Sequence, residues 1–355
     1  MPSEAKKISY ELLLESNIKK VILPYYDLQD YEVTQIKFKD TDKQRAVYKI
    51  DNGINSYCLK KVYYNIEELL FVYSAMEWLY RNKINVPRIL PTNTGGRFVM
   101  ESDMLFILSP WIDGNKCDYD NVENIINSAL NLSKFHNACD NFIPIKGSKY
   151  KEAYADITLS TEKHFEQLLN CSNKAFKYGD KFSKIFLNNF ESSMKLAKLA
   201  LDVSSTISMS NLSISLCHGD YVNKNIIFDN ENNIWTIDFD KCKIDYCTHD
   251  ISYFLRRLLK RDNTRWDLEI AISTLEIYDS IRPLSLDEYK YIFIYLAFPQ
   301  KYWKISKDYY NNINKCNKSS FCNLLNKAAS KNDFQLQFAF EFKDYIENKF
   351  KCTLN

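Results

Sequence analysis

The chain has 355 residues, which is too long for one ordinary core and fits two packed lobes. Apolar residues make up 46% and charged residues 26% of the chain, which is the balance of a soluble globular protein. The net charge of +2 gives no reason to expect general polyanion binding, and we expect no nucleic-acid partner.

The sequence also argues against a membrane or secreted protein. Its first residues include acids and have no sustained apolar stretch, so no signal peptide is predicted. No run approaches the roughly 18 apolar residues of a membrane helix. Ten cysteines, spread from Cys58 to Cys352 without zinc-type spacing, are typical of small buried residues in a reducing compartment. We therefore expect no membrane partner and a protein that is cytoplasmic on synthesis.

The first third of the chain predicts a small β-rich lobe. Strands are recognised by alternating apolar residues, and the Asn52-Gly53 pair is a strong turn signal. Pro24 ends the first helical pattern, and Pro87 follows the second. The predicted elements are a helix at 8–20, strands at 31–38, 45–50 and 56–63, a helix at 66–83, and strands at 97–100 and 104–108.

After an extended crossing at 109–114 the chain is mainly helical. Helices are predicted at 121–138, 160–171, 180–203, 249–260, 265–280 and 286–297, and a short β-rich stretch at 216–244 interrupts them. This order predicts an α+β, bilobal, protein-kinase-like fold. Its parts are a small β-rich N-lobe at 1–108, a hinge at 109–114 and a larger helical C-lobe at 115–355.

The β-rich stretch at 216–244 contains the candidate catalytic and metal-binding residues. An apolar triplet at 226–228, a polar turn and a second apolar run at 234–237 predict an antiparallel hairpin. Asp220 and Asn225 precede its first strand, and Asp238 follows its second. Because a hairpin brings its two open ends together, these three side chains are expected to converge.

Phosphoryl transfer needs this set of side chains. A carboxylate, here Asp220, must accept the proton of the attacking hydroxyl group. An amide oxygen and a second carboxylate, here Asn225 and Asp238, must hold Mg²⁺ on the phosphates of ATP. Asp220 precedes Asn225 by five residues, which is the spacing of the kinase catalytic loop, and Asp238 follows thirteen residues later.

A kinase-like N-lobe also needs a lysine that reaches the α and β phosphates. Lys60 on the third strand is the candidate, and alternation places Lys61 on the opposite face, where solvent can reach it. A helix glutamate orients such a lysine. We prefer Glu68, while Glu67 and Glu77 stay open because helix phase is not fixed by one sequence.

Two further segments correspond to parts of a kinase nucleotide site, and only one of them has residues suited to that role. Ser109 to Trp111 would form the hinge, whose backbone would hydrogen-bond a purine ring. The loop at 39–44 has no glycine, although glycine lets bare backbone approach phosphates closely. Its two aspartates would repel phosphates, so nucleotide binding depends mainly on Lys60 and metal, or is weak or lost.

Other polar residues fit structural roles better than chemical ones. We expect His218 to pack and hydrogen-bond, His136 to be a satisfied core histidine, and Asp250 to cap the helix that follows it. Arg256 and Arg257 fit a solvated helix face better than a phosphate or carboxylate site. Residues 241–355 carry 19 Lys and Arg against 14 Asp and Glu, which disfavours an aminoglycoside as acceptor. Tyr and Trp at 302–310 fit core packing better than sugar stacking.

The motifs resemble known families at two levels. His-Gly-Asp at 218–220 and Ile-Asp-Phe-Asp at 237–240 resemble the small-molecule kinases of the aminoglycoside phosphotransferase superfamily. Successive blocks at 71–92, 105–114, 217–229, 237–261 and 295–305 resemble the CotS family of spore coat proteins. That resemblance implies a kinase-like fold, expression during sporulation, other coat proteins as partners and a final location in the spore coat.

Two functions follow from these observations. The first is an ATP- and Mg²⁺-dependent phosphotransferase that acts on a small hydroxyl-containing molecule during sporulation. The second is a non-catalytic structural component of the spore coat that retains the kinase-like fold. The intact set Asp220, Asn225 and Asp238 favours the first, and the glycine-free loop at 39–44 favours the second.

Overall fold

The structure is a computed structural model that describes residues 11–39 and 44–354. It divides into two compact units, each built from segments that are distant in sequence. The first unit comprises the described part of 1–117 with 138–151 and 223–243, and the second comprises 118–137, 152–222 and the described part of 244–355. The division into lobes at 109–114 stays a prediction.

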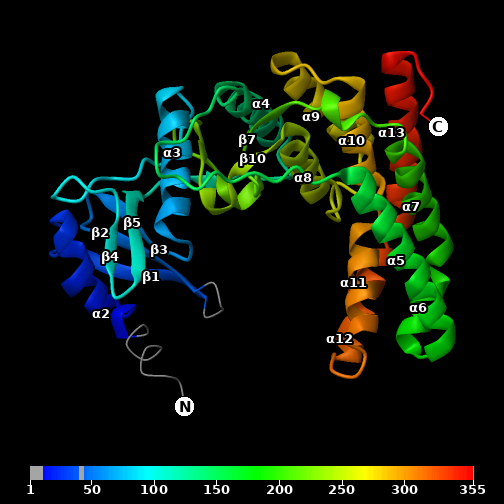
Figure 1. Ribbon diagram of the computed structural model, residues 1–355, viewed down its shortest axis with the longest axis horizontal. Coiled ribbons are helices and arrows are strands. Elements are labelled where there is room, and N and C mark those ends of the chain that lie inside the picture. Colours follow the sequence, from blue (N-terminus) through cyan, green and yellow to red (C-terminus); the bar gives the residue numbers. More distant parts are fainter. Residues whose placement is uncertain (1–10, 40–43, 355) are drawn as a thin grey trace. The chain divides into compact units, whose positions relative to one another are not determined.

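A five-stranded antiparallel sheet lies at the centre of the first unit (Figure 1). Its spatial order is β1-β2-β3-β5-β4, so the first three strands form the predicted meander. The strands are β1 (Glu32–Lys39), β2 (Arg45–Asp51), β3 (Ser56–Val62), β4 (Val99–Glu101) and β5 (Met104–Pro110).

One face of this sheet packs against the N-terminal helical segment. This segment consists of α2 (Glu15–Asn17), a π turn (Ile18–Ile22) and a 3-10 helix (Leu23–Tyr26). It extends past the predicted end because Pro24 lies in the first turn of the 3-10 helix, where no backbone N–H is needed. Residues 8–10 of the predicted helix lie outside the described residues.

A β-bulge in β1 brings Lys37 to the other face of the sheet. The register shifts between Gln35 and Lys37, so Ile36 is the extra residue. After the bulge Lys37 lies opposite Val47, and Val47 in turn lies opposite Lys60 on β3. Because directly paired residues share a face, Lys37 and Lys60 lie on the same side of the sheet.

The helix α3 (Ile66–Arg81) follows the third strand, as predicted. The side chain of Asn65 caps it by accepting a hydrogen bond from the backbone N–H of Glu68 at 3.0 Å. On its buried side, the Nε1–H of Trp78 donates to the carbonyl oxygen of Ala138 at 2.7 Å. This bond ties the segment 138–151 to α3 within the first unit.

The predicted hairpin is present in the first unit. Its strands are β8 (Ile226–Phe228) and β9 (Ile234–Thr236), and β6 (Asn115–Lys116) pairs with β8 on the other side. The pairing is antiparallel, with Ile226 opposite Thr236.

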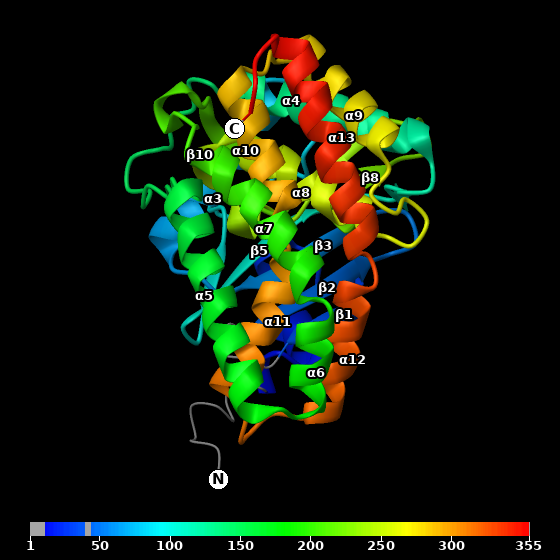
Figure 2. The same ribbon diagram turned by 90° about the vertical axis from the view of Figure 1, so that its right-hand side faces the viewer.

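The second unit is a helical assembly with a two-stranded sheet of β7 (Ile214–Cys217) and β10 (Lys243–Tyr246). Figure 2 shows α5, α7 and α13 running beside one another. Among the described residues, no helix has both the length and the apolar content needed to cross a membrane. The helices are α4 (Val122–Ala138), α5 (Ile157–Tyr178), α6 (Lys181–Asn188), α7 (Phe190–Ser204), α8 (Cys247–Leu259), α9 (Leu268–Ile281), α10 (Leu286–Ala297), α11 (Gln300–Asn311), α12 (Lys318–Ala329) and α13 (Asn332–Phe350).

The central helix of this unit is α10, which packs against α7, α8 and α13. Its residues Tyr289, Ile292, Phe293 and Ile294 point to several sides and are all fully buried. A helix that is buried all round needs apolar residues on every side, and α10 has them.

The last three helices were not predicted individually. Two buried tyrosines fix α11: Tyr302 stacks on Phe186 with ring centres 5.0 Å apart, and Tyr309 stacks on Phe182 at 3.7 Å. The expectation that aromatic residues at 302–310 pack in the core is therefore confirmed. The helix predicted at 180–203 is two helices, α6 and α7, that meet at Asn189.

Gly114 ends the Trp-Ile-Asp-Gly sequence and packs closely on β8. It has φ of 150°, and a Cβ atom built on it would overlap the carbonyl oxygen of Phe228 and lie 2.9 Å from Cγ2 of Ile227. We expect Gly114→Ala to lower the free energy of unfolding by about 3 kcal/mol, because backbone strain and overlap add. Urea denaturation measures the change.

Gly53→Ala is the matched control. Gly53 has φ of 84°, but a Cβ atom there would meet nothing within 4 Å. We expect a loss of only about 1 kcal/mol, from the left-handed backbone alone. Equal losses in the two variants would show that the close approach to β8 is unimportant.

Candidate functional site

Lys60 is held between two carboxylates in the first unit. Its Nζ lies 2.7 Å from Oδ1 of Asp238 and 2.7 Å from Oδ1 of Asp240. The Asp240 side chain is 4% exposed, and the Asp238 side chain is 27% exposed. Burial alone would lower the pKa of Lys60, but the charges of Asp240 and Asp238 raise it above its ordinary value. Lys60 is therefore a permanent cation.

The structure pairs the helix glutamates differently from the prediction. Oε1 of Glu68 accepts a hydrogen bond from Nζ of Lys149 at 2.9 Å, and Glu77 forms ion pairs with Arg81 and Arg88. The backbone N–H of Lys149 also donates to the carbonyl oxygen of Glu67, so Lys149 lies along the first turn of α3. The second carboxylate at Lys60 is that of Asp240, not that of Glu68.

Asp240 was not among the predicted site residues. The backbone bends at Asp238, which has a left-handed φ of 68°, and then enters a 3-10 helix at Phe239–Lys241. This bend turns Asp240 back toward Lys60. A non-glycine residue with positive φ is uncommon and often marks a functional position. The repeated acid in Ile-Asp-Phe-Asp was the only sequence signal for it.

The open end of the hairpin brings Asn225 close to the segment that carries Asp238. The backbone N–H of Ile237 donates to the carbonyl oxygen of Asn225 at 2.9 Å, which closes the hairpin one residue before Asp238. Asn225 is buried. The two ends of the hairpin therefore meet as predicted, while the roles of the two side chains stay predictions.

The oxygen atoms at this end fit a magnesium ion. Mg²⁺ prefers carboxylate and amide oxygens, which Asp238, Asp240 and Asn225 supply. Oδ2 of Asp240 is buried and accepts no hydrogen bond from any described residue, and Nη1 of Arg45 approaches it only to 3.4 Å. A buried oxygen of this kind is one that an additional cation would satisfy.

Lys37 is a further cation on the same face of the sheet as Lys60. The bulge places Lys37 there. Burial lowers the pKa of Lys37, the charge of Asp238 opposes this effect, and the charge of Lys224 adds to it.

Two other predictions concern residues next to this face. Residues 40–43 of the glycine-free loop lie outside the described residues. Lys61 is on the opposite face, as predicted, but it is buried rather than solvated and donates to the carbonyl oxygen of Gln44 at 3.0 Å.

The predicted hinge residues take part in strand pairing. Ser109 on β5 lies opposite Cys58 on β3. The backbone N–H of Trp111 donates to the carbonyl oxygen of Ser56 at 3.0 Å. These contacts fix the backbone of 109–111 in the first unit, and its contact with a nucleotide stays a prediction.

Asp220 lies in a loop of the second unit that the buried carboxylate of Asp250 organises. Oδ2 of Asp250 accepts the backbone N–H of His218 at 2.6 Å, and Oδ1 accepts that of Gly219 at 2.9 Å. Nδ1 of His218 accepts the backbone N–H of Asp220 at 3.2 Å. The expected hydrogen-bonding role of His218 is confirmed. The prediction that Asp250 caps a helix is wrong, because α8 begins earlier, at Cys247, so that Asp250 lies inside its first turn.

His136 completes the support of this loop. Its Nε2 lies 3.4 Å from Oδ2 of Asp250, and its Nδ1 lies 2.7 Å from the hydroxyl oxygen of Tyr278. Although burial opposes it, the hydrogen bond and charge of His136 lower the pKa of Asp250 to about 2. His136 is therefore a satisfied core histidine, as expected.

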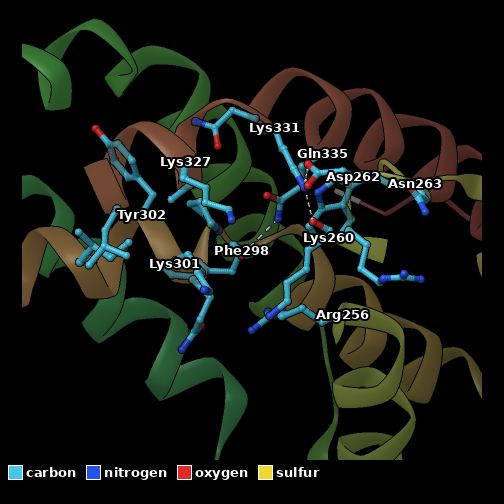
Figure 3. A pocket seen from close by; sticks show the side chains of 18 residues that line it. Arg256, Lys260, Asp262, Asn263, Phe298, Lys301, Tyr302, Lys327, Lys331 and Gln335 are labelled. Carbon is cyan, nitrogen blue, oxygen red and sulfur yellow. Dashed lines mark hydrogen bonds and ion pairs between the residues drawn. The ribbon is translucent and has the colours of Figure 1, made fainter. Parts of the chain in front are cut away.

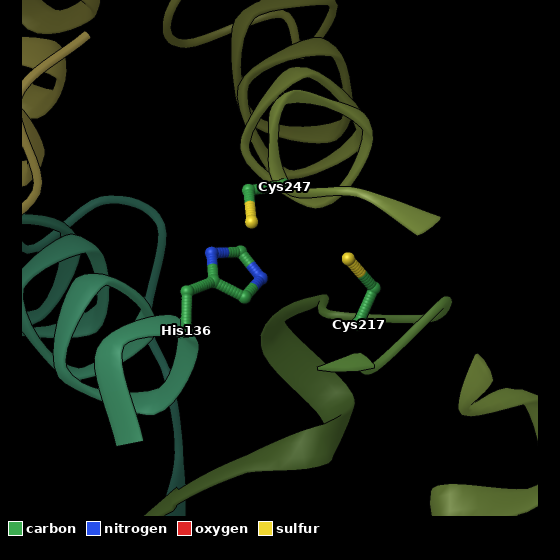
Figure 4. A group of neighbouring side chains, drawn as sticks. All are labelled: His136, Cys217 and Cys247. Atoms are coloured by element: carbon green, nitrogen blue, oxygen red, sulfur yellow. The ribbon is translucent and has the colours of Figure 1, made fainter. Parts of the chain in front are cut away.

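The side chains of Cys217 and Cys247 approach the same histidine (Figure 4). Their Sγ atoms and a ring nitrogen of His136 all lie within 4.8 Å of one another, and all three residues are buried. No motif predicted this cluster, because its residues come from three separate elements, α4, β7 and the start of α8. Since both ring nitrogens of His136 already face oxygen atoms, the cluster fits a packed hydrogen-bonding network.

Comparisons with known proteins identify the fold and the family of the chain. Spore coat protein S of Bacillus subtilis (strain 168) is 21% identical over 308 residues, which is 85% of this chain and 86% of that protein. An aminoglycoside phosphotransferase from Alicyclobacillus acidocaldarius has a similar structure, with a TM-score of 0.74, 17% identity, and coverage of 93% of this chain and 96% of that one.

A spectinomycin phosphotransferase, APH(9)-Ia, solved with ADP and spectinomycin, has a TM-score of 0.63. It is 16% identical, with coverage of 92% of this chain and 97% of that one. The fold is therefore aminoglycoside phosphotransferase-like, with an N-terminal antiparallel sheet followed by a mostly helical region. Residues 29–284, well over half of the chain, match the sequence pattern of one family, and the chain belongs to that family, the phosphotransferase enzyme family (APH).

Proposed function

We propose that this protein is an ATP- and Mg²⁺-dependent phosphotransferase that acts on a small hydroxyl-containing molecule. The observation that carries the proposal is the placement of Lys60 between Asp238 and Asp240, at the end of the hairpin that also holds Asn225. A fixed cation beside a group of oxygen donors is the arrangement that nucleotide phosphates and their metal ion require.

The residues of the first unit bind and orient the nucleotide in this proposal. Lys60 contacts the α and β phosphates, and Ser109 and Trp111 offer backbone groups to the purine. Asp238, Asp240 and Asn225 would hold Mg²⁺, which neutralises charge on the phosphates during transfer. Lys37 lies on the same face of the sheet as Lys60. Its positive charge attracts phosphate and so opposes the repulsion from the two aspartates of the loop at 39–44.

Asp220 is the proposed catalytic base. The five residues from Asp220 to Asn225 span at most about 18 Å, so chain connectivity limits how far the base lies from the metal ligands. Asp250 fixes the loop through the backbone N–H groups of His218 and Gly219. A fixed loop keeps the Asp220 carboxylate ready to accept the proton of the acceptor hydroxyl.

The similarity to spore coat protein S supports a place for this protein in the spore. We propose that it is made in the cytoplasm and then joins the spore coat, with other coat proteins as partners. The same similarity, together with the glycine-free loop, favours the second candidate function, a structural coat component without catalysis.

Nucleotide binding gives the first test. Mg²⁺ and ATP at ~100 times the dissociation constant should add about 2.7 kcal/mol to the stability of the protein, seen as a rise in melting temperature. We expect Asp238→Asn to remove most of the part of this rise that depends on Mg²⁺, because the variant replaces a charged metal ligand with a neutral amide oxygen. Differential scanning fluorimetry with and without Mg²⁺ measures it.

Asp30→Asn is the matched control for this experiment. Asp30 is an exposed aspartate of the first unit, so its variant makes the same chemical change away from Lys60. It should retain the full Mg²⁺-dependent rise. An undiminished rise in Asp238→Asn would remove the support for the proposed metal site.

Phosphoryl transfer gives the second test. We expect Asp220→Asn to lower the rate of ADP formation by about 10²- to 10⁴-fold, which is the usual contribution of a general base. ADP release is followed with a panel of hydroxyl compounds, and with water as acceptor. Since Asp220 is not a proposed metal ligand, the same variant should keep the Mg²⁺-dependent rise in melting temperature.

Spores of a spore-forming host that carry Asp220→Asn separate the two candidate functions. A structural component should assemble into the coat normally in this variant, and the purified wild-type protein should form no ADP. Measurable ADP formation that Asp220→Asn abolishes would reject the purely structural function.

A further inference from the structure

A pocket of about 450 Å³ opens in the second unit beside the end of α8 (Figure 3). Residues from the end of α8, from α11, from α12 and from the start of α13 line it. Its walls include the apolar side chains of Trp266, Phe298 and Ile305. This volume is within the range of pockets that bind small molecules.

The lining of the pocket is strongly cationic. Only one carboxylate, that of Asp262, lines it. The cationic lining residues are Arg256, Lys260, Arg261, Lys301, Lys327 and Lys331. Figure 3 shows the labelled lysines reaching it from several different helices.

Two of these cations already have acidic partners. Arg261 forms two hydrogen bonds of 2.8 Å to the carboxylate of Asp120, and Nζ of Lys331 lies 2.7 Å from Oδ1 of Asp262. In the described parts of the chain, no ion pair involves the remaining four. These are Arg256, Lys260, Lys301 and Lys327. The pocket therefore has an excess of positive charge that its own residues do not neutralise.

Arg256 carries an unsatisfied hydrogen-bond donor. Its guanidinium carbon lies 3.8 Å from the ring centre of Tyr295, which fixes the plane of the group. Its Nε–H is buried and has no hydrogen-bond acceptor among the described residues. Buried donors without acceptors are rare in folded proteins, and one that lines a pocket points to a ligand with acceptor oxygens.

The pKa of Lys260 reflects the positive charges gathered around the pocket. Burial, followed by the charges of Arg257, Lys301, Arg256 and Lys331, lowers the pKa of Lys260 to about 8. An anion in the pocket would relieve this repulsion.

The pocket is connected to the proposed base through α8. Burial and then the charge of Asp220, with a hydrogen bond from the phenol to its carboxylate, raise the pKa of Tyr253. Tyr253 and Asp220 are therefore in contact within the second unit. Arg256 lies about 4.5 Å and Lys260 about 10 Å farther along the helix axis than Tyr253. Because the spacing of three and four residues places Tyr253, Arg256 and Lys260 on one face of the helix, the pocket lies on the same face of α8 as Tyr253.

We infer that the acceptor of this phosphotransferase is an anionic hydroxyl compound, bearing a phosphate or carboxylate group that the pocket at Arg256, Lys260, Lys301 and Lys327 binds. This inference rests on the proposed function, and it names the substrate class. A polycationic aminoglycoside would be repelled by the same residues.

Calorimetric binding of four probes tests the charge preference of the full-length protein. The probes are inorganic phosphate, glucose 6-phosphate, glucose and kanamycin. We expect the two phosphate compounds to bind, more weakly as salt is added, and glucose and kanamycin to bind at least tenfold more weakly than glucose 6-phosphate. Equal or tighter binding of glucose or kanamycin, or no binding of either phosphate compound, would overturn the inference.

Two lysines on α11 provide a matched pair of variants. Lys301 lines the pocket, whereas Lys304 lies outside it, and both are exposed, so neither substitution disturbs the core. We expect Lys301→Glu to weaken glucose 6-phosphate binding by about tenfold or more, because it reverses a charge beside the anion. Lys304→Glu should leave it within about twofold. Equal effects in the two variants would place the anion elsewhere.

The lowered pKa of Lys260 gives a second, independent readout. Below pH 8 Lys260 is charged in the free protein, and above it the lysine must take up a proton when an anion binds. A phosphate monoester stays dianionic from pH 7 to 9, so its own charge does not change. We expect about tenfold weaker binding at pH 9 than at pH 7.

Lys260→Gln identifies the group responsible for this pH dependence. The charged groups around Lys260 are those of Arg256 and Arg257 on α8, Lys301 on α11, Lys331 before α13 and Asp262 after α8. The variant should bind glucose 6-phosphate more weakly at pH 7 and lose most of the change between pH 7 and 9. An unchanged pH profile would show that Lys260 does not contact the anion.

The nucleotide experiment separates this inference from the proposed function. A Mg²⁺-dependent rise in melting temperature with ATP, without preference for phosphate compounds, would retain the phosphotransferase and reject the anionic acceptor. Binding of glucose 6-phosphate without any binding of ATP would reject both the phosphotransferase and the role of the pocket as its acceptor site.

Discussion

The contact of Lys60 with Asp238 and Asp240 is the interaction on which the candidate site of the first unit depends. It joins the five-stranded sheet to the segment after the hairpin, 178 residues later in the chain. The two carboxylates keep the buried ammonium group charged, and the ammonium group keeps two nearby acids from repelling each other. The same contact therefore ties the sheet to the segment after the hairpin and gathers the charged groups of the proposed nucleotide site.

A second constraint acts within the other unit through the buried carboxylate of Asp250. Removing a buried charge from water is unfavourable unless hydrogen bonds replace the lost solvation. Two backbone N–H groups and His136 supply them. The result is a loop before Asp220 that several hydrogen bonds hold in place. Each unit thus arranges its proposed site residues around one buried ionic group.

Local patterns predicted the strands, the hairpin and Lys60, because alternation and turn residues act over a few positions. They did not predict the partner of Lys60, because the bend at Asp238 that brings Asp240 to it is not visible in the sequence. The partner of Glu68 depends on where the segment at Lys149 packs, which is equally non-local. The cationic pocket was missed for the same reason, since its residues come from four separate elements. Two of its lining residues were considered beforehand: Arg256 was assigned to a solvated face, and Tyr302 to core packing.

The replacement of a helix glutamate by Asp240 has a regulatory consequence. In protein kinases the phosphate-contacting lysine is switched by moving the helix that carries its glutamate, so an outward swing of that helix inactivates the enzyme. Here the lysine takes its acid from the chain after the hairpin, and Glu68 on α3 is occupied with Lys149. A displacement of α3 would leave the ion pair at Lys60 in place. The pairing of Lys60 therefore does not rest on α3, and in the proposed phosphotransferase control of this lysine would act through the segment that carries Asp240.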